Sequence, residues 1–343
     1  MTRVVLVDDA GADRLLLREV LRRDASIEIV GEGVDGDAAV ELARRLEPDV
    51  IVMDVLMPGT DGFAATTQIM GERPRPIVLV SSAFPSEAAS AVRALAAGAV
   101  SILEKPGAPT SEGFDRRARE LVRTVKLMHG VNLVRRTAHG RPAVVPPTPA
   151  GEPGTDVRAV AIAASTGGPR ALAEVVGRLP AGFPVPILVV QHIGSGFEPG
   201  LVVWLRDETA LDVTLARSGM RPEPGQLLIG PAGSHLGLAR SGKVELSTAA
   251  AIGGHRPSAT FLFRSVARAH GEHAIGVILT GMGRDGVAGL GEMHAAGARV
   301  IAQDEATSIV YGMPREAIVR GYVDVVLPVE DIAAHLVRWT HRP

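Results

Sequence analysis

The sequence predicts two α/β domains joined by a linker. At 343 residues the chain exceeds the usual single domain, which has about 100–200 residues. Short runs of Val, Ile, Leu and Ala recur beside glycines, and aromatic residues make up only 3% of the chain. Such runs are typical of buried parallel strands that alternate with helices. With 46% apolar residues, each domain has enough material for a full core.

A segment rich in proline and glycine divides the chain. Residues 139–155 read "HGRPAVVPPTPAGEPGT", where neither a helix nor a sheet ladder can be sustained. We therefore predict a first domain at residues 1–130, a linker at 131–156 and a second domain at 157–343. A long loop within one domain is the alternative, but such loops are uncommon in compact folds.

Composition excludes several classes of protein. The formal net charge of −2 gives no positive field for a nucleic acid backbone. The absence of cysteine removes disulfides, thiolate catalysis and thiolate metal sites. No apolar run approaches the roughly 20 residues that span a bilayer, and the N-terminal "MTRVVLVDDA" is unlike the apolar region of a signal peptide. We expect a cytoplasmic protein without membrane insertion or bound nucleic acid.

In the first domain, strands and helices alternate in chain order. The patterns predict strands at 4–7, 27–32, 49–53, 76–80 and 100–104, and helices at 14–23, 37–46, 88–98 and 114–129. Polar residues follow four of these strands: Asp8 and Asp9, then Asp54, Ser81 and Lys105. Because ligands bind at the carboxyl ends of strands in open α/β sheets, we expect these side chains to share one edge.

Three carboxylates at one edge repel one another unless a cation lies among them. A hard oxygen-ligated ion such as Mg²⁺ relieves that repulsion. Lys105 and the Ser81 hydroxyl could then hold a phosphoryl group, with Asp54 as its acceptor, since carboxylates can form aspartyl phosphates. Taken singly, each acid could instead be a helix cap or a solvated turn residue.

The motifs "VLVDD", "VIVMDVLMPGTDG", "VLVSSA" and "ILEKP" resemble the receiver domain of two-component response regulators over residues 2–128. The resemblance implies a five-stranded, doubly wound fold and phosphorylation of Asp54. It also implies Mg²⁺ held by Asp9 and Asp54 with help from Asp8, and a phosphate sensed by Ser81 and Lys105. The phosphodonor would be a histidine kinase of the chemotaxis type.

The second domain repeats the α/β pattern. We predict strands at 157–164, 186–191, 226–231 and 274–280, with a helix at 169–179. Ser165, His192 and Asp285 follow three of these strands or lie shortly after them. If the three strands are parallel neighbours, the serine, histidine and aspartate meet at one rim.

A serine, a histidine and an aspartate can form a catalytic triad, in which the imidazole takes the serine proton and the carboxylate orients the imidazole. The "STGG" turn also offers helix N-terminal N–H groups for an oxyanion. The alternatives are a helix cap or a phosphate loop at Ser165, a structural His192 with His235 as the base, and a turn residue at Asp285.

Residues 157–336 resemble the catalytic domain of the chemotaxis protein-glutamate methylesterases of the CheB type, through "ASTGGP", "VVQHI", "HRPSATFLFRSVA", "LTGMGRDGVAGL" and "IAQDEATSIVYGMPREAI". The resemblance implies a doubly wound, mainly parallel domain. It makes Ser165 the nucleophile, His192 the base and Asp285 its partner, with Thr166 and Met282 lining the site near the oxyanion.

The same resemblance implies a phosphorylation-activated serine hydrolase. It would demethylate glutamate methyl esters, and deamidate glutamines, on methyl-accepting chemoreceptors, without a cofactor in the catalytic domain. One alternative is a noncatalytic, phosphorylation-dependent receptor-binding module. A DNA-binding regulator is disfavoured, because no compact set of three helices with a basic recognition helix is apparent.

Overall fold

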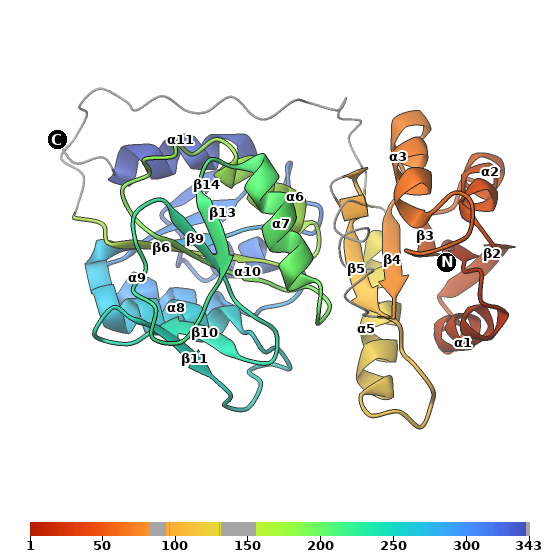
Figure 1. The fold of residues 1–343 in the computed structure, drawn as a ribbon, viewed down its shortest axis with the longest axis horizontal. Helices are drawn as coiled ribbons and strands as arrows, with labels where there is room; N and C mark the ends of the chain where they lie inside the picture. Colours follow the sequence, from red (N-terminus) through yellow and green to blue (C-terminus); the bar gives the residue numbers. More distant parts are fainter. Residues whose placement is uncertain (83–93, 96, 130, 132–155, 341–343) are drawn as a thin grey trace. The chain divides into compact units, whose positions relative to one another are not determined.

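The computed structural model describes residues 1–82, 94–95, 97–129, 131 and 156–340 (Figure 1). The chain divides into two compact units. Most of the predicted helix at 88–98 and of the predicted linker at 131–156 lies outside the described residues.

The first unit is built on a parallel five-stranded sheet with strand order β2-β1-β3-β4-β5. Its strands are β1 Thr2–Val7, β2 Ile27–Gly33, β3 Val50–Asp54, β4 Ile77–Ser81 and β5 Ser101–Glu104. Its described helices are α1 Gly11–Arg22, α2 Gly36–Leu46, α3 Gly62–Glu72 and α5 Phe114–Met128. Helix α1 contacts α5, and α2 contacts α3, as in a doubly wound fold. The predicted fold of this domain is confirmed.

Local sequence explains where these elements begin and what they bury. Asp35 and Asp61 cap α2 and α3, each accepting a hydrogen bond from the backbone N–H three residues later. Strands β3 and β4 are buried throughout, which is why they read as continuous apolar runs. Helix α5 buries one face, which includes Leu121 and Val125, and these apolar residues recur at helical spacing.

The second unit is built on a seven-stranded sheet with order β14-β13-β12-β6-β7-β9-β8, in which every neighbouring pair is parallel. Its strands are β6 Ala159–Ala164, β7 Ile187–Gln191, β8 Asp212–Leu215, β9 Gln226–Ile229, β12 Ala274–Ile278, β13 Arg299–Gln303 and β14 Val325–Leu327. A separate antiparallel hairpin pairs β10 His235–Leu238 with β11 Val244–Ser247. The prediction of a mainly parallel sheet is confirmed.

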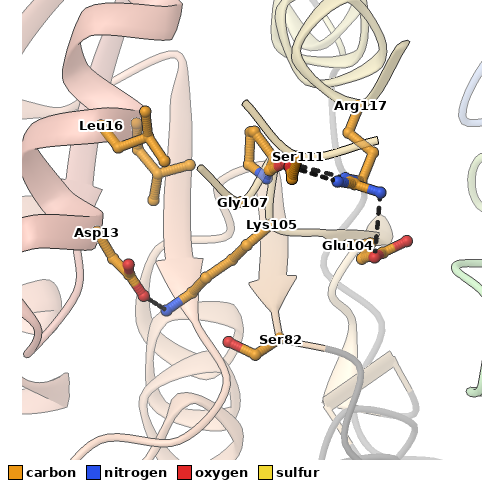
Figure 2. Close-up of a pocket in the computed structure, with 10 residues that line it drawn as sticks. Asp13, Leu16, Ser82, Glu104, Lys105, Gly107, Ser111 and Arg117 are labelled. Carbon is orange, nitrogen blue, oxygen red and sulfur yellow. Dashed lines mark hydrogen bonds and ion pairs between the residues drawn. The ribbon is translucent and has the colours of Figure 1, made fainter. Parts of the chain in front are cut away.

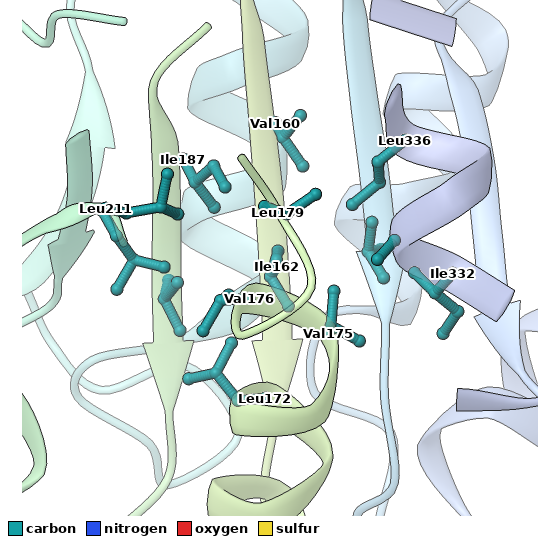
Figure 3. Close-up of a cluster of buried hydrophobic side chains, with 14 of the residues drawn as sticks. Val160, Ile162, Leu172, Val175, Val176, Leu179, Ile187, Leu211, Ile332 and Leu336 are labelled. Carbon is teal, nitrogen blue, oxygen red and sulfur yellow. The ribbon is translucent and has the colours of Figure 1, made fainter. Parts of the chain in front are cut away.

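Helices cover both faces of this sheet. They are α6 Gly168–Val176, α7 Glu198–Glu208, α8 Ala259–His270, α9 Val287–Ala295, α10 Met313–Val319 and α11 Val329–Thr340, with a short 3₁₀ turn at Gly271–His273. Alternate residues of β6 enter opposite cores: Val160 and Ile162 pack with α6 and α11 (Figure 3), whereas Ala161 faces the core on the side of α8. The small alanine side chains of β6 leave room on that side for the large apolar residues of α8 and α9.

Within the described residues, no helix combines the length and apolar character that a membrane crossing requires.

Candidate active site and phosphorylation site

The strand order of the first unit brings its predicted site residues together. Asp8 and Asp9 follow β1, Asp54 ends the neighbouring β3, and one carboxylate oxygen from each lies within 4.8 Å of the others. Asp8 and Asp54 are buried, and Asp9 is exposed. Three carboxylate oxygens at this spacing, one of them open to solvent, fit a hard divalent cation that keeps several water ligands.

Lys105 provides the positive charge of this cluster. Its Nζ lies 2.9 Å from Asp8 Oδ2 and 3.0 Å from Asp54 Oδ2. It also lies 2.9 Å from Asp13 Oδ2 on α1 (Figure 2), a partner that sequence reasoning did not find. Asp13 belongs to no strand end, so the strand-end rule gives no signal for it.

Burial sets the ionisation of this cluster. It raises the pKa of Asp54 to about 6, because the attraction of Lys105 only partly offsets the loss of solvation. Burial likewise raises the pKa of Asp8. Burial alone would lower the pKa of Lys105, but its carboxylate partners raise it above the ordinary value. Two buried acids with raised pKa values are a further reason to expect a bound cation here.

Ser81 ends β4, between β3 and β5, and is fully buried. Its carbonyl accepts a hydrogen bond of 2.8 Å from the Lys105 backbone N–H. A pocket of about 210 Å³ opens beside Lys105, lined mainly by α1 and by the segment that follows β5 (Figure 2). The acids, Ser81 and Lys105 therefore occupy adjacent strand ends, in the arrangement expected of them.

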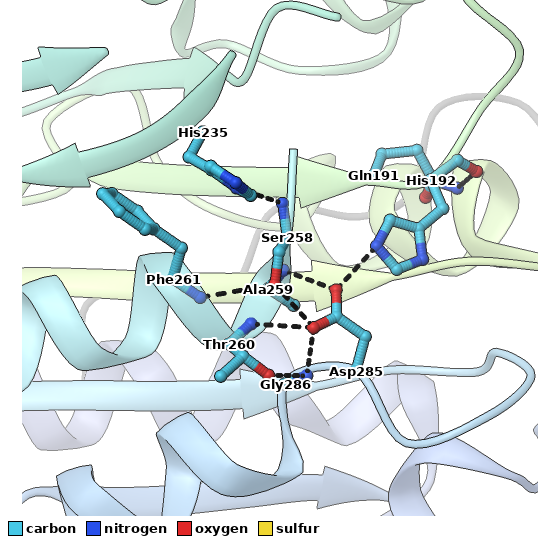
Figure 4. A network of polar contacts seen from close by, with 9 residues as sticks. All are labelled: Gln191, His192, His235, Ser258, Ala259, Thr260, Phe261, Asp285 and Gly286. Carbon is cyan, nitrogen blue, oxygen red and sulfur yellow. Dashed lines mark hydrogen bonds and ion pairs between the residues drawn. The ribbon is translucent and has the colours of Figure 1, made fainter. Parts of the chain in front are cut away.

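In the second unit, β6 lies between β12 and β7 and is parallel to both. Ser165 follows β6, and His192 follows β7 in register with it. Asp285 lies in the loop after β12 and accepts a hydrogen bond from His192, with 3.0 Å between Nε2 and Oδ2 (Figure 4). The structure therefore pairs the predicted imidazole with the predicted carboxylate, although 93 residues separate them in the chain.

Asp285 is held by the N-terminus of α8. Its Oδ1 accepts hydrogen bonds from the Ser258 hydroxyl at 2.7 Å, the Thr260 N–H at 3.1 Å and the Gly286 N–H at 3.0 Å. Its Oδ2 accepts one from the Ala259 N–H at 2.7 Å. Burial by itself would raise the pKa of Asp285, but His192 and these donors outweigh burial and hold that pKa well below its usual range. The carboxylate is therefore fixed as an anion.

Ser165 is held closely from the backbone side. Its N–H donates to the Thr280 carbonyl at 3.0 Å, and Gly281 approaches so closely that a Cβ there would lie 2.7 Å from the Ser165 Cβ. The Ser165 hydroxyl makes no hydrogen bond to any described residue. The predicted hydrogen bond between Ser165 Oγ and the His192 ring is therefore not formed in the structure.

The His192 ring is oriented for a second partner. Since Nε2 donates to Asp285, Nδ1 carries the free lone pair, and this atom is buried without a hydrogen-bond partner in the described part of the chain. The ring of His255 stacks on it, with centroids 4.1 Å apart and planes 7° from parallel. A buried, unpaired imidazole nitrogen is suited to accept a proton.

Thr166 and Met282 are the other two residues that the sequence predicts to line the site. Thr166 follows Ser165, is 7% exposed, and its carbonyl accepts a hydrogen bond from Thr280 Oγ1 at 3.0 Å. Met282 is half-buried and follows Gly281, the residue packed against Ser165. Gly167 has φ of +75°, which lets the chain turn directly into α6.

His235, the alternative base, is fully buried in β10. Its Nδ1 accepts the Ser258 N–H at 3.2 Å, and its Nε2 lies 3.1 Å from the Ala250 carbonyl. Both ring nitrogens are therefore engaged with backbone groups, which favours His192 over His235 as the base.

Sequence reasoning missed two supports of this site. Ser258 is the N-cap of α8, and the serine in "RPSATF" before an apolar run was a readable helix-start signal. Gln191, the last residue of β7, donates from its Nε2 to the Ser165 and His192 carbonyls, and no local pattern in the sequence indicates these two partners.

Together these features define a class: a response regulator in which a receiver sheet is joined to a parallel α/β domain carrying a serine, a histidine and an aspartate at one sheet edge. Comparison with known proteins agrees. Residues 160–336 match the model of the CheB methylesterase family, and residues 4–111 match that of the response regulator receiver domain.

Two curated relatives match the chain over nearly its full length. The protein-glutamate methylesterase/protein-glutamine glutaminase 3 of Anaeromyxobacter dehalogenans (strain 2CP-C) is 48% identical over 100% of both chains. The protein-glutamate methylesterase/protein-glutamine glutaminase 4 of Myxococcus xanthus (strain DK1622) is 46% identical over 97% of this chain and 96% of the relative. Among solved structures, the crystal structure of the Thermotoga maritima CheB methylesterase catalytic domain matches this chain with a TM-score of 0.51. The two sequences are 41% identical, and the match covers 53% of this chain and 97% of that domain. This chain belongs to the CheB methylesterase family.

Proposed function

We propose that the chain is a protein-glutamate methylesterase and protein-glutamine glutaminase in which Ser165, His192 and Asp285 form the catalytic triad. The observation that carries the proposal is the His192–Asp285 hydrogen bond, which leaves Nδ1 buried and unpaired at the edge where Ser165 emerges. The substrates are γ-glutamyl methyl esters and selected glutamines of methyl-accepting chemoreceptors.

The geometry supports a two-step acyl transfer. Ser165 Oγ attacks the ester carbonyl carbon while its proton passes to His192 Nδ1, and Asp285 stabilises the imidazolium that results. The carbon–oxygen bond to the methoxy group then breaks, and the proton leaves with methanol. Water attacks the acyl-enzyme, gives a proton to His192, and releases glutamate as Ser165 recovers its proton. With glutamine, ammonia leaves in place of methanol.

Backbone donors would stabilise the negative oxygen that forms in each step. Thr166 and Met282 flank the nucleophile and are the proposed contributors. Loss of one oxyanion donor costs about 3 kcal/mol in other acyl-transfer enzymes. No metal or cofactor is needed in this domain for the steps described.

In the receiver domain, Asp54 is the proposed phosphate acceptor, and a chemotaxis-type histidine kinase is the proposed donor. Asp9 and Asp54, assisted by Asp8, would hold Mg²⁺, which when bound neutralises charge on the phosphoryl group. Lys105 would give up its ion pair with Asp54, and Lys105 and Ser81 would then contact the phosphoryl oxygens. The proposed boundaries are 1–130, 131–156 and 157–343, with both domains working in the cytoplasm.

Replacement of the serine tests the catalytic proposal. Ser165→Ala should reduce methanol release from methylated receptor by at least about a thousandfold, because it removes the proposed nucleophile. Ser218→Ala removes the hydroxyl of an exposed serine and should leave the rate unchanged. Equal methanol release by Ser165→Ala and the parent would instead favour a noncatalytic receptor-binding module.

A further inference from the structure

The Gln191 side chain connects the two segments that carry Ser165 and His192. Its Nε2 donates one hydrogen bond to the Ser165 carbonyl at 2.9 Å and another to the His192 carbonyl at 2.8 Å. We propose that Gln191 is a positioning residue, which sets the separation between nucleophile and base; this inference rests on the roles proposed above for those two residues.

The orientation of this amide follows from its surroundings. Gln191 is 3% exposed, and both N–H groups of its amide are used by the two carbonyls. The reversed orientation would set Oε1 against two carbonyl oxygens, all three of them acceptors. The amide can therefore occupy this place in only one way, which gives a rigid link.

The other end of the amide also shows a constraint. Oε1 is buried and has no hydrogen-bond partner among the residues described. It lies against Gly168, where a Cβ would be only 2.2 Å away. An unpaired buried acceptor lowers the stability of the folded state. The side chain therefore keeps Nε2 between the two carbonyls while its Oε1 stays unpaired in a tight space.

A separate link is needed because the sheet ladder ends here. The last hydrogen bond between these two strands runs from the His192 N–H to the Ala164 carbonyl at 2.9 Å. Beyond it the two segments carry the reacting groups, and Ser165 Oγ makes no hydrogen bond to His192 in the described structure. The Gln191 amide spans this gap. A misplacement of about 1 Å can reduce the rate about a hundredfold.

The test uses the full chain and two measurements: methanol release from methylated receptor, and the rate at which a fluorophosphonate probe labels Ser165. Gln191→Met keeps the side-chain length and removes both donors. We expect kcat to fall about 10-fold to 100-fold with KM within about twofold, and labelling to fall by the same factor. Gln191→Asn keeps the amide on a shorter side chain and should give intermediate values.

Thr209→Val is the matched control. Like Gln191→Met, it removes a buried hydrogen bond from a side chain to a backbone carbonyl. The Thr209 hydroxyl donates to the Val176 carbonyl at 2.7 Å, and Val176 is at the opposite end of α6 from Ser165. This variant should lose thermal stability while kcat and labelling stay within about twofold of the parent.

The outcomes separate this inference from the function on which it rests. If Gln191→Met melts lower but keeps the parent's kcat and labelling rate, Gln191 is only structural and the inference is wrong. If Gln191→Met fails to fold, Gln191→Asn decides the question. A labelling rate for Gln191→Asn equal to that of the parent would then show that the inference is wrong. If the probe never labels Ser165 in the parent, the proposed nucleophile is wrong instead.

Discussion

At the scale of single residues, Asp285 shows how a buried charge is stabilised by donors from a neighbouring helix. Four donors besides His192 reach its two oxygens, and three of them come from residues 258–260 at the start of α8. Hydrogen bonds to a charged group contribute about 1.5–3 kcal/mol each. The α8 N-terminus therefore keeps the carboxylate both ionised and correctly turned toward the imidazole.

Ser258→Ala should lower kcat about tenfold, because Asp285 loses a charge-assisted donor and with it part of its orientation. Ser265→Ala is the control. The buried Ser265 hydroxyl on α8 accepts from the Leu238 N–H and donates to the Leu262 carbonyl, and it makes no hydrogen bond to Asp285 in the described structure. Both variants should unfold at lower urea concentration than the parent, and only Ser258→Ala should lose methanol release. Equal rates for the two variants would contradict the role of Ser258.

The raised pKa of Asp54 predicts a pH dependence of Mg²⁺ binding. Since burial raises this pKa to about 6, the carboxylate is ionised above pH 7 and increasingly protonated below pH 6. Protons then compete with the metal, so calorimetric titration should show the affinity constant falling by up to about tenfold per pH unit below 6. Asp54→Asn should bind more weakly at pH 7.5, with a smaller slope. An affinity independent of pH between 5 and 7.5 would be evidence against Asp54 as a ligand.

At the scale of elements, both sites form where parallel strands end side by side. In the second unit β12, β6 and β7 are consecutive in the sheet, so the segments after them converge. That convergence requires a small residue between β12 and the serine loop. Gly281 meets this need, because any Cβ there would lie 2.5 Å from Met313 Sδ and 2.7 Å from the Ser165 Cβ.

Gly281→Ala should displace the Ser165 loop and reduce fluorophosphonate labelling at least about tenfold. The expected loss of stability is about 1–3 kcal/mol, typical of an overpacked site. Gly182→Ala is the control, since a Cβ at Gly182 meets no atom within 4 Å. Parent-like labelling of Gly281→Ala would mean that the loop tolerates the shift.

At the scale of the whole molecule, one chain carries a receiver domain and a methylesterase domain, and under the proposed function the first would control the second. Under the proposed function, each turnover would convert a neutral receptor side chain into an anion and so alter the repulsion between receptor helices. A phosphodonor should therefore raise methanol release by the full chain, with Mg²⁺ present.

Asp54→Asn should abolish this activation and keep the basal rate, because Asp54 lies in a different domain from the proposed triad. Methanol release is measured with and without the phosphodonor, and Asp49→Asn, which changes an acid near the opposite end of β3, serves as the control. Activation of Asp54→Asn to the parent's level would exclude this residue as the acceptor.

The sequence by itself determined the five strands of the first sheet, the strands β6, β7, β9 and β12 of the second, and the strand ends that carry Asp54, Lys105, Ser165 and His192, because apolar runs and the polar residues after them are local signals. Only the tertiary structure decided which strands became neighbours, and hence that Asp285 meets His192 and that Asp13 meets Lys105. The tertiary structure also decided two supporting contacts. The Ser258 hydroxyl donates to Asp285, and the Gln191 amide donates to the Ser165 and His192 carbonyls. The physical reason is that hydrogen bonds between residues distant in the chain depend on strand order and helix placement, which local periodicity does not encode.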